Sequence, residues 1–365
     1  MKPRPVVAFF ALSVLTLFAL TGCGTTTSDK PFPAGRSYVY VANNGSQTIS
    51  AFQRDISTGT LTEIPGAPFA ANVQPGHWSS SLTVDPKNQM LFAQGAGVSV
   101  YLINPDTGAL SVAAGSPFSV PPTASIRSAS VDPQGRFVFA GTQGAGILAW
   151  KIDRAHHTLV SVQGPFGDLA TPYTATVDNT GKLLYAAGYT HGIETFAIDP
   201  ESGTLQLVNG PFYIPNHAPL QITMHPSGNY AYIQGDANDL SLRLWVCAVI
   251  PSDGAVSALE QESGGVPLLG LTQDGRYLFT TLGTYGTLPD SPYLWTYSAD
   301  PLLSLLPSAI AVSPDGKFVY ATSALQSAPG SLSVFSLDET TGTLAPIEGS
   351  AYVVGPQPVA VAMTH

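Results

Sequence analysis

Charge is scarce in this chain. Only 10% of its 365 residues are Asp, Glu, Lys or Arg, against about 25% in an average soluble protein. The 14 basic residues are outnumbered by 24 acidic ones, which gives a net charge of −10. Because binding to phosphates needs a basic face, we expect no nucleic-acid partner. The hydrophobic share of 44% is enough for a packed core and excludes disorder for the bulk of the chain.

Cysteine is almost absent, and no window of the sequence shows a sustained helical period. The chain holds only Cys23 and Cys247, so at most one internal disulfide is possible. Cys247 lies in an apolar run and is interpreted as a small core residue. Without repeated apolar residues at the 3.6-residue period, long amphipathic helices are excluded. Turn formers are plentiful instead, with 36 Gly and 31 Pro, and they favour a turn-rich β protein.

A long apolar run stands at the N-terminus, between Val6 and Leu20, after the basic Lys2 and Arg4. It is shorter than the ~20 residues that span a bilayer and is typical of a signal peptide. The following Leu20-Thr21-Gly22-Cys23 resembles the lipobox of bacterial lipoproteins, whose cysteine becomes lipidated. We therefore predict a lipoprotein signal peptide over residues 1–22, a lipidated tether over 23–36 and one folded domain over 37–365. An ordinary secretory signal and an N-terminal transmembrane anchor are the alternatives.

Lipidation of Cys23 predicts a protein of the bacterial cell envelope that is held to the membrane by its N-terminus. Gly24, and not aspartate, follows the cysteine. In a Gram-negative host, the resemblance to lipoproteins then implies the outer membrane or a periplasmic face. Once Cys23 carries lipid, Cys247 has no disulfide partner. We expect a monomer.

A tight-turn signature recurs along the rest of the chain. It begins as Asp-Pro-x-Asn or Asp-Pro-x-Gly at Asp85 and Asp132, and shorter variants follow. Pro presets φ for such a turn, and Gly or Asn accepts the positive φ that ends it. Alternating apolar runs flank each turn, so each one predicts a β-hairpin. The last residues of six such turns are spaced 47, 46, 47, 47 and 41 apart, at Asn88, Gly135, Gly181, Gly228, Gly275 and Gly316.

Two further landmarks complete the repeat: a Thr-Gly-x-Leu turn about twenty residues later, and then Gly-x-Pro-Phe. Four strands in a repeat of about 45 residues are typical of a β-propeller blade. We name these strands A to D from the axis outward. The chain is therefore predicted to be an all-β, seven-bladed propeller with four antiparallel strands per blade. Strands A are expected to begin near Leu82, Ser128, Thr174, Gln221, Leu268, Ala309 and Val359.

The two ends of the domain are expected to share one blade. The first strand, 37–42, has the pattern of a strand B but no strand A before it. The last strand, 358–364, has no hairpin partner after it. Pairing the C-terminal strand into the N-terminal blade would close the ring and leave no open sheet edge there.

The repeated residues resemble a known family. Asp-Pro-x-Gly, then aromatic-Val-Tyr/Phe-Ala, then Thr-Gly-x-Leu and Gly-Ser-Pro-Phe are similar to the lactonase-type seven-bladed propellers, which include 6-phosphogluconolactonase. Tyr38-Val39-Tyr40-Val41-Ala42-Asn43 also resembles the Tyr-Val-Thr-Asn repeat propellers. The resemblance spans residues 37–365. Members of the family often carry a His-x-His pair and an Asp-Leu-Gly loop, and this chain has neither.

Candidate site residues lie where strands A are expected to begin, since function concentrates on loops at the ends of a rigid scaffold. Counted back from the last turn residue, His77 and His217 share one register position, and Arg127 and Tyr173 share another. An imidazole can act as a general base, and a guanidinium can hold a carboxylate or oxyanion. The predicted catalytic residues are thus His77, Arg127 and His217. The predicted ligand-binding residues are Trp78, Tyr173, Tyr189 and His191.

Two functions are compatible with these residues. The first is a scaffold of the envelope that binds a small molecule or an envelope protein through a divergent lactonase-type site. The second is a hydrolase that opens an unphosphorylated lactone, the chemistry that the family resemblance implies. No cofactor motif is present. The acidic run 236–239 lacks the glycine of a calcium loop, so no metal site is predicted.

Overall fold

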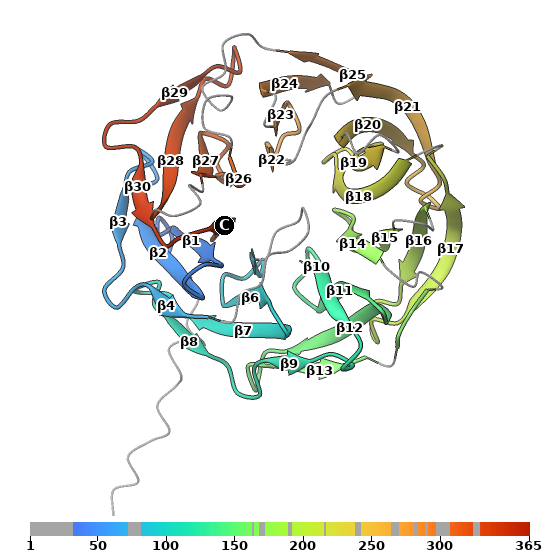
Figure 1. Cartoon of the computed structure of the whole chain (residues 1–365), viewed down its shortest axis with the longest axis horizontal. Coiled ribbons are helices and arrows are strands. Elements are labelled where there is room, and N and C mark those ends of the chain that lie inside the picture. The colour runs from blue at the N-terminus through green and yellow to red at the C-terminus, as the bar shows by residue number, and fades with distance from the viewer. Residues whose placement is uncertain are drawn as a thin grey trace, which may run out of the picture.

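The computed structural model shows a ring of seven antiparallel sheets around a central axis (Figure 1). The described residues contain strands and turns but no helix, and no helix among them is long and apolar enough to cross a membrane. The structure describes residues 32–71, 82–162, 164–167, 172–188, 192–214, 217–237, 242–263, 270–280, 283–288, 291–296, 307–323 and 329–365.

Each sheet has the predicted strand order A to D from the axis outward. Strands A are β31 (Pro358–Met363), β5 (Leu82–Val84), β10 (Ser125–Val131), β14 (Pro172–Val177), β18 (His217–Met224), β22 (Gly270–Leu271) and β26 (Ala309–Val312). Strands B are β1 (Tyr38–Asn43), β6 (Met90–Gln94), β11 (Phe137–Gln143), β15 (Leu183–Gly188), β19 (Tyr230–Ala237), β23 (Tyr277–Thr280) and β27 (Phe318–Ser323).

The outer two positions of each blade follow the same order. Strands C are β2 (Thr48–Arg54), β7 (Gly97–Ile103), β12 (Gly146–Asp153), β16 (Gly192–Ile198), β20 (Leu242–Val249), β24 (Gly283–Leu288) and β28 (Gly330–Leu337). Strands D are β3 (Leu61–Glu63), β8 (Leu110–Val112), β13 (Thr158–Ser161), β17 (Leu205–Phe212), β21 (Val256–Ser263), β25 (Ser291–Thr296) and β29 (Leu344–Pro346). Three short strands add to the outer edge by pairing with strand C: β4 (Phe69–Ala70), β9 (Phe118–Ser119) and β30 (Tyr352–Val354).

The core lies between the blades, and the alternation of side chains along each strand explains why. On β1, Tyr38 and Tyr40 pack against blade 2, whereas Val39 and Val41 pack against blade 7. Successive side chains of a strand point to opposite faces, so one apolar strand contributes to two junctions. Each of the seven junctions holds its own hydrophobic cluster among the described residues. The ring is therefore held together by packing between neighbouring blades.

The Asp-Pro-x-Gly turns join strands A and B, as predicted, and the aspartate closes each one. Asp132 is fully buried, and its carboxylate accepts hydrogen bonds from the backbone N–H groups of Arg136 and Phe137. Asp85 and Asp178 do the same in blades 2 and 4. These acids are turn formers, because a short side chain that bonds its own backbone stabilises the turn.

The Thr-Gly turns join strands C and D and also contact the preceding blade. Gly203 in blade 4 has φ +76°, and a Cβ atom there would lie 2.5 Å from the Phe137 ring of blade 3. Gly59 meets Phe318 in the same way, and Gly108 meets Tyr38. Glycine is needed for two reasons: the left-handed backbone and the close approach of a neighbouring aromatic ring.

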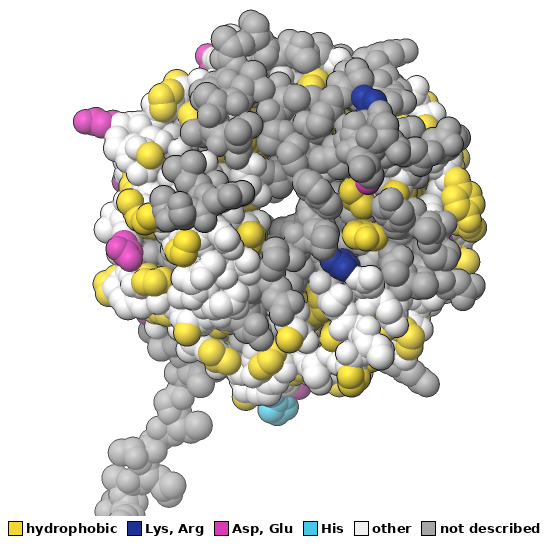
Figure 2. Space-filling model, in the orientation of Figure 1, with side chains coloured by type: hydrophobic (Ala, Val, Ile, Leu, Met, Phe, Trp, Pro, Cys, Tyr) yellow, Lys and Arg dark blue, Asp and Glu magenta, His cyan; other side chains and the backbone are white. Residues whose placement is uncertain are grey.

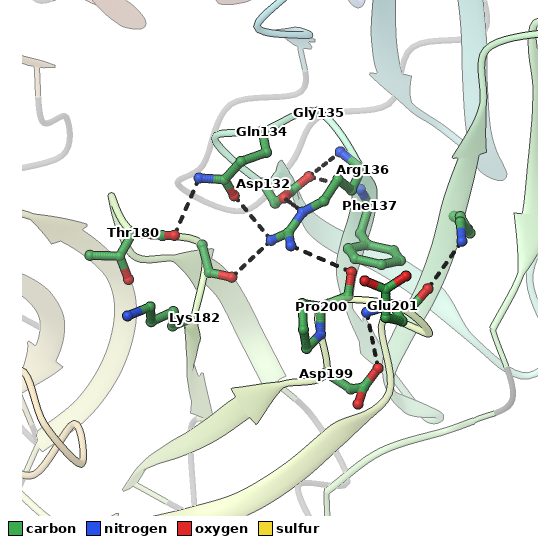
Figure 3. A network of polar contacts seen from close by, with 12 residues as sticks. Asp132, Gln134, Gly135, Arg136, Phe137, Thr180, Lys182, Asp199, Pro200 and Glu201 are labelled. Carbon is green, nitrogen blue, oxygen red and sulfur yellow. Dashed lines mark hydrogen bonds and ion pairs between the residues drawn. The ribbon is translucent and has the colours of Figure 1, made fainter.

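Long polar side chains connect the blades at the face that carries the A–B turns. In Figure 3, Arg136 of blade 3 bonds Asp132 in its own turn (2.7 Å) and the Gly181 carbonyl oxygen of blade 4 (3.0 Å). Beside it, the amide of Gln134 donates to the Thr180 carbonyl oxygen (3.2 Å). Other junctions use other arginines, such as Arg154, which bonds Asp85, Gln89 and the Gly135 carbonyl oxygen. These contacts align neighbouring blades.

The ring closes as predicted, with the C-terminal strand as strand A of the N-terminal blade. β31 pairs antiparallel with β1, with Val39 opposite Met363 and Ala42 opposite Ala360. The Tyr38 backbone N–H donates to Thr364 Oγ1 (2.9 Å). This pairing leaves no unpaired edge between the first and the last strand.

His225 takes the place of the turn aspartate in blade 5 and connects this blade to blade 6. Its buried ring accepts a hydrogen bond from the Ser227 backbone N–H at Nδ1 (3.0 Å), and Nε2 lies 3.1 Å from the Gly275 carbonyl oxygen. Burial lowers the pKa of His225, against smaller raising effects of the Gly275 carbonyl and Asp274. A proton on Nδ1 would face the hydrogen of the Ser227 N–H group. The contacts at this junction therefore favour the neutral ring.

We predict that Gly203→Ala destabilises the protein more than Gly316→Ala. Both glycines have positive φ (+76° and +72°), but a Cβ atom at position 316 would meet nothing within 4 Å. In both variants the free energy of unfolding falls by about 1–2 kcal/mol, because alanine is strained in the left-handed backbone conformation. Only Gly203→Ala loses roughly 1–3 kcal/mol more, because the added methyl group is forced against the Phe137 ring. Urea denaturation measures both losses, and equal losses would contradict the inter-blade role of the Thr-Gly turn.

The pH dependence of stability provides a second prediction. The pKa of folded His225 lies below its ordinary value of 6.5, so the unfolded chain binds the proton first as the pH falls. The free energy of unfolding then declines through pH 6.5 and levels off below the folded pKa. We expect His225→Asp, which restores the common turn residue, to lose less stability than the wild type between about pH 7.5 and pH 5.5. Urea denaturation at both pH values tests this, and parallel declines would show that His225 does not titrate there.

Candidate functional site

Four of the described strands A carry a β-bulge at the same register position, and three of them are neighbours. The bulges fall between Ile126 and Ser128 on β10, between Pro172 and Thr174 on β14, and between Pro219 and Gln221 on β18. The extra residues are Arg127, Tyr173 and Leu220, and the fourth bulge, between Pro358 and Ala360 on β31, leaves out Val359. A bulge leaves its residue outside the ladder and redirects its side chain, which is why bulges are common beside active sites.

These bulges correct the predicted strand starts. Strands A were expected to begin near Ser128, Thr174 and Gln221, but β10, β14 and β18 begin at Ser125, Pro172 and His217. The bulge lets pairing continue past the irregular residue, so the ladder is longer than the alternating pattern indicates. Arg127 and Tyr173 therefore stand on strands and not on the loops before them, and a paired backbone fixes their positions.

The structure brings Arg127 and Tyr173 together. The guanidinium carbon of Arg127 lies 5.6 Å from the centre of the Tyr173 ring, and both side chains are partly exposed. Arg127 Nη2 donates a hydrogen bond to Gln143 Oε1 at the end of the adjacent β11. The charge over the aromatic face contributes about 0.5–1 kcal/mol at an exposed site. Arg127 is thus held from two sides.

A glycine gives β14 room to approach β10 closely. A Cβ atom at Gly141 on β11 would lie 3.1 Å from both the Pro172 carbonyl oxygen and Ser128 Oγ. Directly below, Ser128 Oγ accepts a hydrogen bond from the Ala175 backbone N–H (2.8 Å), which joins the strands A of blades 3 and 4. The absent side chain at Gly141 and this bond together place Tyr173 beside Arg127.

A channel of about 850 Å³ runs along the axis, and its lining includes Ser128 and Thr174, the residues that follow Arg127 and Tyr173. Figure 2 shows an opening at the centre of the ring. Strands A of all seven blades contribute to its lining. The lining combines hydroxyl and amide groups with a larger number of apolar side chains, such as Val177, Ile222 and Leu271, and none of its described residues is Lys or Arg. The polar residues of the lining are Thr83, Ser128, Ser130, Thr174, Thr176, Asp178, Asn179, Gln221, Thr223, Thr272, Gln273 and Ser308.

Most of the other predicted site residues lie outside the part of the chain that the structure describes. His77, Trp78, Tyr189 and His191 lie outside the described residues. The backbone of His217 begins β18 opposite Ala237, but its side chain is not described. Arg127 and Tyr173 are therefore the two predicted site residues that the structure places in contact.

Sequence reasoning missed Gln143 and Gly141. Neither belongs to a repeated motif, and their roles follow only from the pairing of β10 with β11 and the approach of β14. Among the described residues, no group of three or more His, Cys, Asp or Glu side chains is arranged to hold a metal ion. The chemistry available in the described part is a fixed cation over an aromatic face, an amide, and hydroxyls below.

The comparisons with known proteins agree with the fold. A family model described as lactonase, 7-bladed beta-propeller, matches residues 96–220, about a third of the chain. This stretch contains Arg127, Gln143 and Tyr173. A 6-phosphogluconolactonase of Enterobacter sp. (strain 638) is 33% identical over 114 residues, which cover 30% of this chain and 31% of that protein. The match thus spans about a third of the length of this curated relative.

Solved structures extend the likeness to almost the whole chain. A protein from Lactobacillus plantarum superposes with a TM-score of 0.68 at 17% identity, covering 90% of this chain and 99% of that one. A periplasmic gluconolactonase from Pseudomonas aeruginosa superposes with a TM-score of 0.65 at 18% identity, with the same coverage. Identities this low establish the fold alone. They confirm the predicted seven-bladed β-propeller fold, and the family match over residues 96–220 agrees with the resemblance to lactonase-type propellers that the repeats predicted.

Proposed function

We propose that this protein is a lipid-anchored propeller of the bacterial envelope that binds a small ligand at the Arg127 end of its channel. The ligand carries a carboxylate or a lactone carbonyl group. The observation that supports this proposal is the Arg127 guanidinium, fixed between the Tyr173 ring and Gln143 on the residue that precedes the channel-lining Ser128. A guanidinium is suited to bidentate contact with a carboxylate, and a ring beside it offers an apolar face. The anchor is the predicted lipid on Cys23, which lies outside the described residues.

A binding measurement tests this proposal. D-gluconate, the open form of an aldonolactone, is titrated into the full-length protein by calorimetry. We expect Arg127→Gln to weaken binding by about tenfold or more, since a hydrogen bond to a charged group contributes roughly 1.5–3 kcal/mol. Lys151→Gln is the matched control, because it removes the same charge at a residue that is exposed on strand C. Equal affinities of Arg127→Gln and the control would place the ligand elsewhere.

A second candidate function is hydrolysis of the lactone. The family match favours it, because the matched residues 96–220 contain Arg127, Gln143 and Tyr173. Water would attack the carbonyl carbon, the ring C–O bond would break, and the alkoxide would take up a proton. The product acid then releases one proton at neutral pH. Arg127 would stabilise the oxyanion, and His77 or His217 would serve as base; the side chains of both histidines lie outside the described part of the chain.

Proton release after addition of D-glucono-1,5-lactone distinguishes an enzyme from a binding protein. For the enzyme, we expect Arg127→Gln to lower kcat by ~10²–10³, the loss typical of a removed oxyanion donor. The double variant His77→Ala with Arg127→Ala should return the rate to the spontaneous one. Lys151→Gln should keep the wild-type rate. Binding of gluconate without any acceleration of lactone opening would support the binding function and reject the hydrolase.

A further inference from the structure

At four consecutive junctions, from blades 2–3 to blades 5–6, a polar side chain lies between two A–B turns. It donates a hydrogen bond to a carbonyl oxygen of the later turn. At blades 3–4, for example, Arg136 donates to the Gly181 carbonyl oxygen (3.0 Å, Figure 3). The four donors and the residues that accept are Arg154 with Gly135, Arg136 with Gly181, Asn179 with Pro226, and His225 with Gly275.

The junction of blades 6 and 7 differs, because a groove of about 340 Å³ lies between its A–B turns. A Cβ atom at Gly316 would meet nothing within 4 Å, whereas one at the equivalent Gly181 would lie 2.1 Å from Gln134 Oε1. No hydrogen bond from the residues that the structure describes reaches the carbonyl oxygens of Asp315 and Gly316. The groove therefore lies where the other junctions have a donor.

Two replacements remove that donor from blade 6. In blade 3, Asp132 accepts from Arg136 Nε (2.7 Å), and the Gln134 amide donates to the next turn. At the equivalent positions blade 6 has Thr272 and Asp274. Threonine has no charge to hold an arginine, and an ionised carboxylate can only accept hydrogen bonds. An acceptor has thus replaced a donor at the edge of the groove.

Arg276, the counterpart of Arg136, is held away from the Gly316 carbonyl oxygen. Its Nε donates to Asp274, and its Nη1 donates to the Glu339 carbonyl oxygen (2.9 Å). Its Nη2 lies 3.6 Å from Glu339 Oε2. These contacts tie the guanidinium to its own turn and to the C–D turn of blade 7. The acceptors of the blade 7 A–B turn remain open to a ligand.

The lining of the groove suits a cation with an apolar stem. Three carboxylates line it, on Asp274, Asp315 and Glu339. They are opposed by two guanidinium groups, the lining Arg276 and the Arg54 that bonds Asp315, which leaves an excess of one negative charge. Asp274 and Glu339 are about half exposed, so the groove is accessible from outside. Apolar parts of the lining come from Tyr277, Pro314 and Leu337.

We propose that this groove binds an alkylguanidinium group, the side chain of an arginine that a partner protein presents. A guanidinium carries several donors in one plane and can bond a carboxylate and a carbonyl oxygen together. It is also the group that lies between the A–B turns at blades 2–3 and 3–4. The aliphatic stem of arginine packs readily on apolar surface. The groove lies at the opposite end of strands A from Arg127, so this inference is independent of the proposed function.

Analogues of three side chains test the proposal. Nα-acetyl-L-arginine amide is titrated into the full-length protein, and its binding is followed by saturation-transfer NMR. We expect a dissociation constant of about 1 mM. The citrulline analogue has the same shape without the charge and should bind about tenfold more weakly or worse. The lysine analogue should bind about threefold to tenfold more weakly, because an ammonium lacks the planar fork of donors.

Two variants test where the arginine analogue binds. Asp274→Asn removes a carboxylate from the groove and should weaken binding about tenfold. Gly316→Asn adds a side chain at the edge of the groove and should weaken binding as well. Asn88 has this register position in blade 2 with φ +58°, so asparagine is compatible with the turn. Glu201→Gln, in the exposed C–D turn of blade 4, removes the same charge elsewhere and should bind like the wild type.

A preference for the arginine analogue that Asp274→Asn loses and Glu201→Gln keeps supports the inference. The inference fails if the arginine analogue does not bind the wild type, or if the citrulline analogue binds equally well. Equal binding of the lysine analogue would show that the groove recognises charge alone, and the guanidinium assignment would be wrong. If Asp274→Asn and Gly316→Asn both bind like the wild type, the analogue binds elsewhere and the inference is overturned.

Discussion

Each blade is apolar on both faces, and neither face can be buried within the blade itself. Strand β1 shows the problem in one element, because Tyr40 must be covered by blade 2 and Val41 by blade 7. Burial of a large apolar side chain is worth about 1.5–3 kcal/mol, so every open junction would be costly. A ring is the arrangement in which each face has a neighbour. The pairing of β31 with β1 completes that ring, and the other six junctions depend on it.

The turns of the repeat have two functions at once. The aspartate turn closes a hairpin, and the arginines beside it bond carbonyl oxygens of the next blade, as Arg136 does with Gly181. The Thr-Gly turn reverses the chain, and its glycine meets an aromatic ring of the preceding blade. Short motifs therefore determine both the hairpins and the spacing between blades. At the other end of strands A the pattern is interrupted by bulges, and that is where Arg127 and Tyr173 lie. A regular ring with local irregularities at one end is a scaffold suited to holding a site.

The repeats were sufficient to predict the fold, whereas the site was only partly predictable. The spacing of the turns predicted the number of blades. The strands at 37–42 and 358–364, each without a hairpin partner, predicted that the C-terminal strand closes the ring. Both predictions follow from the local repeat. Register counting placed Arg127 and Tyr173 at one equivalent position, and the structure adds that their side chains are in contact. The bulges that redirect them, the amide of Gln143 and the close approach of β14 at Gly141 were not predictable. These depend on which strands approach one another, and no local pattern encodes that approach.

The account rests on the claim that the ligand lies between Arg127 and the axis of the ring. A crystal structure of the protein soaked with D-gluconate tests this most directly. The account predicts the carboxylate within hydrogen-bond distance of the Arg127 guanidinium and the rest of the ligand beside the Tyr173 ring and Ser128. A ligand bound on the A–B turn face or at the outer strands, with the Arg127 end of the channel filled by water alone, would contradict it.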